Sequence, residues 1–437
     1  MQAGRFFGLA LAITTGSLSL VMPAYAQVTE MPSPGAVTPP EVYYGQPVPE
    51  GVLQRARPEL QPQGVVLEGL QWLPSITPSA TYDTNIFATQ SHATGDFVFR
   101  TRPEIDVRSL PEAGPITMNL DGYVQDVRYG NHGSLGHDDF GGTLDLGGDF
   151  EPTGRLASHT AFNYYHQDPA SFAISSANGA LHTLPVEKTF IEDLTGTHDV
   201  GLLGLALNGG YERDEFQNFT INGVTFNQKQ LNDNAVKFGP KLSYEVSPGL
   251  RPFVAGQYIR RFYDHGVFDS NSYAFTGGSD FDIHELIRGT AYAGYDVRDY
   301  DSSAIGTVNG FTYGLNLSWF PTELLTLTFS GGQNFSDTVI TSSNGTPSVL
   351  DAKTVRGEAD YELLRQVILS GVVAYENDNY TQVSRTDNIV SAGASVKYLM
   401  NRYVSLVGEY TYSDRRSNLN GFNFDRHQIG VALTLAY

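Results

Sequence analysis

The sequence predicts an all-β protein, a transmembrane antiparallel up-and-down β-barrel of about eighteen strands. The last nine residues, Ile429 to Tyr437, alternate between apolar side chains and small or polar ones, which is the period of a strand with two different environments. This period recurs from residue 72 to the end of the chain, with connections that are short and long in turn. Outer-membrane barrels combine such strands with short turns at one rim and long loops at the other.

Residues 1–26 predict a secretory signal peptide. Arg5 precedes an apolar run from Phe6 to Val21, and Ala24-Tyr25-Ala26 is a small-x-small cleavage pattern. Its removal leaves 47 acidic and 26 basic residues, a formal charge of −21. This charge argues against nucleic acid as a partner, because nucleic-acid binding needs clustered Lys and Arg. The chain has no cysteine, which excludes disulfides and zinc–thiolate sites.

Residues 27–71 predict a Pro-rich periplasmic linker. Eight prolines lie among polar residues between positions 32 and 62, and the apolar side chains are too few to form a core. The segment is also too short to be the folded plug domain of an energised outer-membrane transporter.

Residues 72–437 form the predicted barrel. No apolar run after the signal peptide approaches the roughly 20 residues of a membrane-spanning helix. Strands are expected at residues 75–84, 97–108, 116–129, 138–150, 155–167, 188–199, 202–217, 231–246, 250–263, 271–283, 287–299, 309–319, 324–336, 351–362, 366–380, 387–399, 402–414 and 424–437. Among the long connections, 168–187 is apolar for an exposed loop and is a candidate constriction, although contact with a partner protein would explain it as well.

The apolar face of each strand is expected to meet lipid. In residues 311–319, Phe311, Leu315 and Trp319 share one face, while small and polar side chains occupy the other. Only a closed sheet satisfies its backbone hydrogen bonds in hydrocarbon. The alternative, a soluble β-sandwich, also alternates, but it gives no reason for the sorting of short and long connections.

The opposite face carries charges of both signs and predicts a water-filled lumen. The candidate lumen-lining residues are Arg100, Arg102, Glu104, Asp106, Asp121, Asp145, Lys237, Lys241, Arg288, Asp296, Arg298, Arg356 and Glu358. Two interpretations stay open: facing rows of opposite charge that create a field across the lumen, as in diffusion porins, or charges that pair with one another to brace the wall. Tyr123 and Tyr292 are possible members of an aromatic rail for sugars.

No catalytic residue, metal site or cofactor is predicted. The ten histidines are scattered and match no Ser-His or Asp-His hydrolase pattern. His132, His137, Asp138 and Asp139 have the donor types that bind a divalent ion, but the favoured interpretation is a solvated loop.

The first predicted strands carry a recognisable motif. Tyr82-Asp83-Thr84-Asn85-Ile86-Phe87, followed by Asp96 and Arg102-Pro103-Glu104-Ile105, resembles the opening of the putative β-barrel porin 2 family. The resemblance covers about residues 74–437 and implies an outer-membrane barrel, often associated with exopolysaccharide or capsule systems, without catalytic residues. Because proline cannot donate a ladder hydrogen bond, a bulge or an unpaired position is expected at Pro103.

Two hypotheses follow for a barrel in the bacterial outer membrane. The first is a passive, porin-like channel for polar or saccharide solutes. The alternative is an accessory barrel for exopolysaccharide or capsule secretion or for surface attachment. The expected partners are outer-membrane lipid and lipopolysaccharide, the barrel-assembly machinery through the C-terminal strand, and, under the second hypothesis, polysaccharide.

Overall fold

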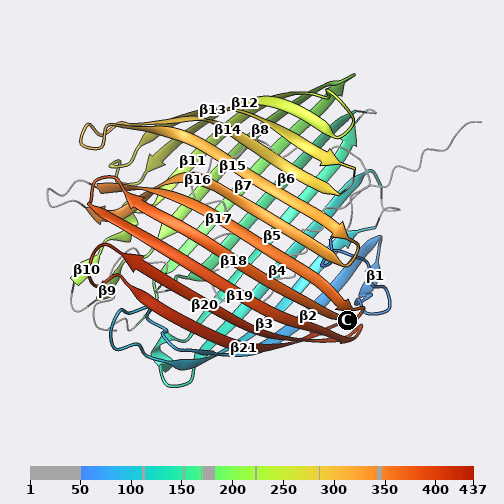
Figure 1. Cartoon of the computed structure of the whole chain (residues 1–437), viewed down its shortest axis with the longest axis horizontal. Coiled ribbons are helices and arrows are strands. Elements are labelled where there is room, and N and C mark those ends of the chain that lie inside the picture. The colour runs from blue at the N-terminus through green and yellow to red at the C-terminus, as the bar shows by residue number, and fades with distance from the viewer. Residues whose placement is uncertain are drawn as a thin grey trace, which may run out of the picture.

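Eighteen antiparallel strands close into a barrel (Figure 1). The structure is a computed structural model that describes residues 51–110, 114–150, 153–168, 170, 183–221, 224–284, 286–341 and 347–437. The predicted signal peptide and the first part of the predicted linker lie outside the described residues. A further short strand, β1 (Val65–Leu67), pairs only with the beginning of β2.

The predicted strands are confirmed, and their ends differ from the prediction by a few residues. The barrel strands are β2 (Leu70–Asp83), β3 (Asp96–Ser109), β4 (Ile116–Tyr129), β5 (His137–Phe150), β6 (Gly154–His166), β7 (Val186–Val200), β8 (Leu203–Phe216), β11 (Asp233–Tyr244), β12 (Leu250–Tyr263), β13 (Ser270–Ile283), β14 (Ile287–Tyr300), β15 (Thr307–Thr322), β16 (Leu325–Thr341), β17 (Pro347–Leu364), β18 (Val367–Tyr380), β19 (Arg385–Asn401), β20 (Val404–Ser417) and β21 (Phe424–Ala436). β2 pairs with β21 and closes the sheet.

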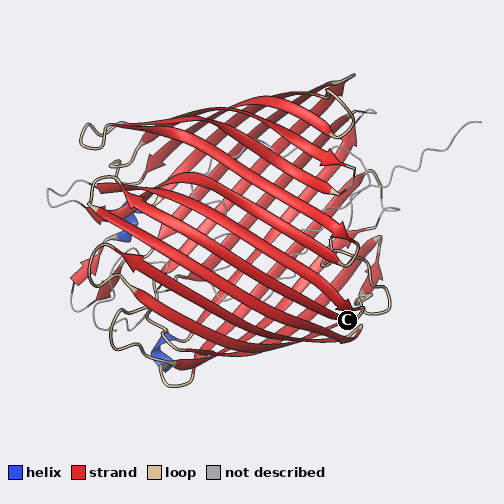
Figure 2. Ribbon diagram, in the orientation of Figure 1, coloured by secondary structure: helices blue, strands red, loops and turns tan. Residues whose placement is uncertain are grey.

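The connections at the outer rim hold the remaining small elements. These are the 3₁₀ turns η2 (Gly133–Leu135) and η4 (Gln228–Leu231) and the hairpin of β9 (Phe219–Ile221) with β10 (Val224–Phe226). Figure 2 shows both helical turns at one rim, opposite the rim that carries the C-terminus. Within the described ranges, no helix has the length and hydropathy needed to cross a membrane.

One predicted connection is wrong. Residues 337–350 were expected to be a loop, but β16 continues to Thr341 and β17 begins at Pro347. The ladder between β15 and β16 ends at the pair Gly314–Gly332, and beyond it β16 pairs with β17 alone. β17 stays paired with β18 up to Leu350, so the sheet opens only between β15 and β16, and β16 makes the buried contacts described below.

Prolines interrupt the ladder in two places. The register of β3 with β4 skips Arg102 and Pro103, which confirms the unpaired position expected there. The register of β2 with β21 likewise skips Thr77 and Pro78. At this second gap the hydroxyls of Thr77 and Thr434 lie 3.0 Å apart and bond side chain to side chain, so the closing seam keeps a polar link on its inner face.

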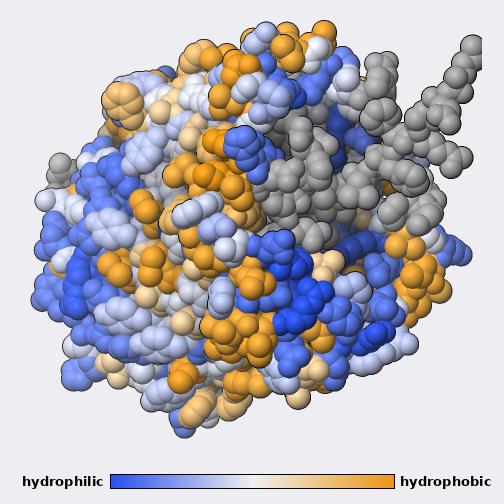
Figure 3. All heavy atoms as spheres, turned by 45° about the vertical axis from the view of Figure 1, so that its right-hand side comes forward, coloured by the Kyte–Doolittle hydropathy of each residue, from blue (hydrophilic) through white to orange (hydrophobic). Residues whose placement is uncertain are grey.

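The two faces of the wall have the expected character. Phe311 is 74 % exposed on the outer face, and its neighbour Thr312 on the inner face is 4 % exposed. Phe275 and Thr276 repeat this contrast on β13. Figure 3 shows apolar residues spread over the outer wall of the barrel. An apolar exterior on a closed sheet satisfies the requirements of a lipid bilayer.

Candidate functional site: the lumen and its two mouths

Charged side chains on the inner face pair mostly with close neighbours. Arg102 donates to Glu104 at 3.0 Å, and Arg356 donates to Glu358 at 2.9 Å. The two partners of each pair are two positions apart on one strand, and therefore point to the same face about 7 Å apart, a distance that an arginine spans. These charges are neutralised along the wall rather than arranged as opposite rows across the lumen.

Other predicted residues pair between strands. Lys241 donates to Asp280 at 2.8 Å, and His159 lies 2.6 Å from Asp145. The remaining pairs of this kind are Lys237 with Glu212, Arg288 with Asp282, and Arg298 with Asp337, and on β3 Asp106 pairs with Arg108. Arg100, Asp121 and Asp296 also lie on inner-face positions. The pairing agrees with the second interpretation of the inner charges, in which they brace the wall.

Residues 51–62 of the predicted linker lie in the periplasmic mouth. The backbone N–H of Val52 donates to Thr326 Oγ1 at 2.9 Å, and Arg57 Nη2 donates to Glu362 Oε2 at 2.5 Å. Val52 is 1 % exposed and Arg57 is 2 % exposed. Thr326 and Glu362 belong to the inner faces of β16 and β17 near the short turns. We call residues 51–62 the mouth segment.

The mouth segment is folded around the Arg57 guanidinium. Arg57 donates to the carbonyl oxygens of Val52 at 2.9 Å and Arg55 at 3.1 Å, while its own N–H donates to Gln61 Oε1 at 2.9 Å. Hydrogen bonds to a buried guanidinium compensate its desolvation and give this short segment one conformation. A single wall residue, Glu362, supplies the anion for both Arg55 and Arg57.

A solvent-exposed ion pair also joins the mouth segment to the rim. Arg365, in the turn after β17, donates to Glu59 at 2.8 Å. This hydrogen bond lowers the pKa of Glu59 below its ordinary value. Both side chains are about half exposed, so the pair contributes little compared with the buried contact to Glu362.

A cavity of about 250 Å³ remains between the mouth segment and the inner wall. It is lined by Arg57 and Leu60 of the segment and, among others, by Glu104, Asp106, Arg108, Asp121 and Lys397 of the wall. Three of the predicted lumen-lining residues, Glu104, Asp106 and Asp121, therefore meet at one place. Positively charged side chains and carboxylates therefore line the same cavity.

At the outer mouth, the described part of the β16–β17 hairpin packs against the nearby strands β12 and β14. Asp337 accepts hydrogen bonds from the hydroxyls of Tyr263 at 2.5 Å and Tyr300 at 2.6 Å. Arg298 donates to the carbonyl oxygen of Phe335 at 3.1 Å. An apolar cluster surrounds this network, namely Tyr263, Phe268, Tyr300, Ile305, Phe335 and Val349. The hairpin therefore narrows the outer mouth next to β12 and β14.

The motif that carries the family resemblance holds the first outer loop. Asp83 accepts from Arg426 at 2.8 Å, and Arg426 also donates to Asp168 at 2.8 Å. Asn85 donates to the carbonyl oxygens of Thr89 at 2.9 Å and Asp425 at 3.0 Å. These buried side chains join the first loop, the last strand and the start of the connection after β6.

Part of the predicted constriction also lies at this mouth. The carbonyl oxygen of Ala170 accepts from Arg415 at 3.2 Å, and Leu184 joins Ile86, Phe87 and Val127 in a buried apolar cluster. Both described ends of the connection 168–187 thus contact the inner side of the barrel. Its middle lies outside the described residues.

One of the two tyrosines predicted for an aromatic rail, Tyr123, is covered by an arginine side chain. The Arg102 guanidinium lies 3.9 Å from the centre of the Tyr123 ring, a cation–π contact. That face of Tyr123 is therefore covered by Arg102, and a sugar would have to displace it.

Several residues of the two mouths were not predicted from the sequence. Glu362, Asp337 and Arg426 sit in expected strands or connections, and strand parity would have placed Glu362 and Arg426 on the inner face. Arg57 carried no such signal, because it lies in a Pro-rich stretch without a period.

The closed sheet, the apolar exterior and the charged interior define a bacterial outer-membrane β-barrel of the porin class, a class that is generally non-enzymatic. A sequence model described as putative beta-barrel porin 2 matches residues 57–437. The chain belongs to this family. No curated protein matches the chain.

Two solved structures are similar to the chain at low identity. OpdK of Pseudomonas aeruginosa, solved with vanillate, has 12 % identity and a TM-score of 0.46, and the match covers 84 % of this chain and 99 % of that one. OccAB4 of Acinetobacter baumannii has 14 % identity and a TM-score of 0.44, over 84 % of this chain and 98 % of that one. At these values the likeness carries no information on the solute.

Proposed function

We propose that the protein is a diffusion channel for small polar solutes, and that the mouth segment is its periplasmic gate. The observation that carries the proposal is the cavity between the mouth segment and the charged wall, where Glu104, Asp106 and Asp121 face Arg108 and Lys397. Barrels of sixteen to eighteen strands are wide enough for an aqueous channel, and the family is one of porins.

The gate assignment rests on the kind of contacts that hold the mouth segment, which are side-chain contacts and not strand pairing. Its buried polar contacts to the wall go to Thr326 and Glu362, whereas the outer hairpin is continuous with the wall through β16 and β17. Displacement of the segment breaks no strand pairing of the barrel. A rearrangement of the hairpin would also break the apolar cluster around Phe335.

The solute class follows from the chemistry of the cavity walls. Carboxylates offer acceptors, and the guanidinium and ammonium groups of Arg57, Arg108 and Lys397 offer donors. A neutral solute with many hydroxyls, or a zwitterion, can use both, while a solute with a single charge meets repulsion from one set. Small saccharides are therefore the first solutes to test.

An engineered disulfide tests the gate, because the native chain has no cysteine. A Cβ built on Gly51 lies 3.4 Å from Thr326 Oγ1, and its closest neighbour is the flexible end of Gln54. We expect the Gly51→Cys, Thr326→Cys double variant to be silent in a planar bilayer when oxidised and to conduct after reduction. Each single variant serves as a control that conducts under both conditions.

Oligosaccharides added to the conducting protein then test the solute. Blocking that depends on saccharide concentration supports the proposed solute class. If the reduced double variant and the native protein are both folded and silent, the channel proposal is wrong, and the accessory role in polysaccharide secretion or attachment takes its place.

A further inference from the structure

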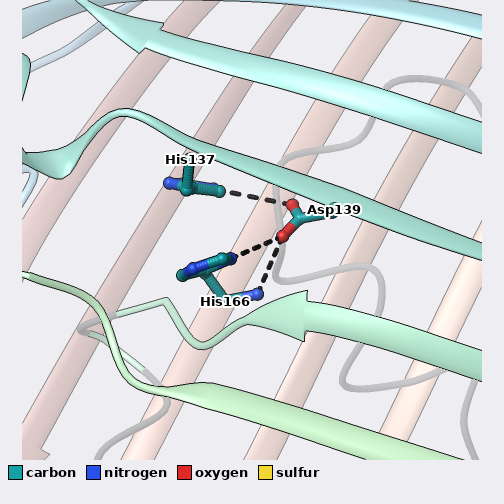
Figure 4. Close-up of side chains that lie close together, drawn as sticks. All are labelled: His137, Asp139 and His166. Atoms are coloured by element: carbon teal, nitrogen blue, oxygen red, sulfur yellow. Dashed lines mark hydrogen bonds and ion pairs between the residues drawn. The ribbon is translucent and has the colours of Figure 1, made fainter.

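Two histidines and an aspartate converge where β5 begins and β6 ends, at the outer rim of the barrel (Figure 4). His137 and Asp139 lie at the beginning of β5, and His166 is the last residue of β6. The side chains of His137 and Asp139 are each 9 % exposed, and that of His166 is 15 % exposed. One ligand atom from each residue lies within 4.8 Å of the other two.

The carboxylate of Asp139 faces both imidazole rings. His137 Nε2 lies 3.5 Å from Asp139 Oδ2, and His166 Nδ1 lies 2.8 Å from Asp139 Oδ1. The two rings stack, with their centres 4.4 Å apart and an angle of 30° between their planes. Figure 4 shows both rings approaching the carboxylate from the same side.

The hydrogen bond made by His137 Nδ1 fixes whether the other ring nitrogen, Nε2, carries a proton in the neutral ring. His137 Nδ1 lies 2.7 Å from the carbonyl oxygen of Leu135 and must donate its proton there, because a carbonyl oxygen only accepts. In the neutral ring, Nε2 then holds a lone pair that points toward a carboxylate oxygen. Two acceptors that face each other at low exposure require a cation between them.

We propose that His137, Asp139 and His166 bind a divalent transition-metal ion, with Zn²⁺ as the best match to the donors. Two imidazoles and one carboxylate form a common three-ligand set for zinc, which leaves the fourth position for water or a solute group. Each imidazole binds as its neutral tautomer through a lone pair, so His137 keeps its proton on Nδ1 and His166 carries its proton on Nε2.

The three residues are close enough to reach one ion. Ligand bonds of about 2.1 Å in a tetrahedron place two ligand atoms about 3.4 Å apart, and one ligand atom from each residue already lies within 4.8 Å of the other two. His137 Nε2 lies 3.5 Å from Asp139 Oδ2 and His166 Nδ1 lies 2.8 Å from Asp139 Oδ1. The two rings face different oxygens of the carboxylate, so rotation of the side chains is needed for one oxygen and both nitrogens to bind the same ion.

Outer contacts orient the three ligands, as in known metal sites. Leu135 holds His137 through its carbonyl oxygen, Gln125 Nε2 donates to Asp139 Oδ2 at 3.4 Å, and the backbone N–H of His166 donates to Asp139 Oδ1 at 2.9 Å. The loop residues first considered as ligands are engaged elsewhere: His132 lies 2.7 Å from Asp96, and Asp138 accepts from Arg128 at 3.3 Å.

The position of the site suggests what the metal would do, and this step rests on the proposed channel function. The metal would join the start of β5 to the end of β6, directly before the connection whose next residues, Asp168 and Ala170, contact Arg426 and Arg415. A bound ion would stiffen this part of the outer mouth. Metal binding and conductance are separate measurements, so failure of one proposal is distinguishable from failure of the other.

The direct test is a Co²⁺ titration of the refolded, chelator-treated mature protein in detergent, because protein-bound Co²⁺ absorbs visible light. We expect a saturable d–d spectrum that Zn²⁺ abolishes by displacement. The His137→Ala and His166→Ala variants should lose this spectrum. Asp139→Asn, which keeps the size of the side chain and removes its charge, should lose it as well.

A second histidine–aspartate pair supplies the matched control. His159 lies 2.6 Å from Asp145 on the same two strands, but within the described part of the chain it belongs to no group of three metal-ligating side chains. The His159→Ala variant should keep the Co²⁺ spectrum. Heat-modified gel mobility shows whether each variant is folded.

Three outcomes overturn the metal site: no spectrum with folded native protein, a spectrum that survives in folded His137→Ala and His166→Ala, or a spectrum that is lost in His159→Ala. If the folded native protein gives no spectrum, the positive charge between the two imidazole rings and Asp139 is a proton. Single-channel recordings with Zn²⁺ and then with chelator complete the test: the expected result is a change of conductance in the native protein and none in His166→Ala.

Discussion

The two mouths of the barrel are both narrowed by the chain itself, but in different ways. At the periplasmic mouth, residues 51–62 lie against the wall and are held chiefly through Glu362 and Thr326. At the outer mouth, the β16–β17 hairpin is part of the wall, and Asp337 joins it to Tyr263 and Tyr300. The periplasmic mouth is thus narrowed by a separate segment, and the outer mouth is narrowed by two strands of the wall itself.

Because of this difference, the free-energy cost of opening the periplasmic mouth is lower than that of opening the outer mouth. Removal of a separate segment leaves every barrel hydrogen bond in place, so its cost is the loss of a few buried contacts. Opening the outer mouth exposes a closed apolar cluster and leaves buried polar groups unpaired, which costs much more. The periplasmic side is thus suited to gating and the outer side to a permanent constriction.

The largest expected effect comes from deletion of residues 51–62. We expect a several-fold increase in single-channel conductance, because the cavity beside Arg57 becomes continuous with the periplasm. The barrel should keep its heat-modified gel mobility, since no barrel strand is removed. Conductance equal to that of the native protein would show that the segment does not limit passage.

Substitution Asp337→Ala should produce the next largest effect, this time on stability. It leaves the buried guanidinium of Arg298 without its carboxylate and two tyrosine hydroxyls without their acceptor. Loss of one partner of a buried pair costs about 3–5 kcal/mol. Urea unfolding measures the loss.

The control for Asp337→Ala is Lys353→Ala on the same hairpin, because this side chain is 41 % exposed. We expect a change within about 0.5 kcal/mol for such a surface site. Equal effects of the two substitutions would mean that the hairpin is not held as described.

Substitution Glu362→Gln should loosen the mouth segment without unfolding the barrel. The amide keeps one acceptor for Arg57 but loses the charge, and a hydrogen bond between charged groups contributes about 1.5–3 kcal/mol. Trypsin should therefore cleave after Arg55 faster than in the native protein, whereas the bond after Arg57 resists trypsin because Pro58 follows it. Glu358→Gln, on the same face of β17, should leave cleavage unchanged.

The smallest expected effect concerns pH. Because Arg365 lowers the pKa of Glu59, their pair stabilises the docked segment above the ordinary carboxyl pKa of about 4.5 and loses this effect as the pH falls through the lowered value. The open probability should rise slightly in acid in the native protein. Arg365→Gln should remove this component, and an identical acid response in that variant would rule out Glu59.

The strands, their number and their two faces could be predicted from the sequence. Period-two alternation is local, and one slip would turn every side chain to the wrong face, so strands such as β4 and β12 could be predicted at their observed residues. The same parity placed Arg298 inward, and the missing N–H of proline predicted the gap in the ladder at Pro103.

Which side chains contact one another depends on the tertiary structure. Arg426 pairs with Asp83 from the other end of the chain, Arg298 meets Asp337 beyond the point where β16 stops pairing with β15, and Arg57 reaches Glu362 from a stretch without a period. Parity gives the face of a residue, but its neighbours depend on the register between strands and on closure of the barrel. Those are global properties, and for that reason the two mouths and the histidine–aspartate cluster could not be read from local pattern.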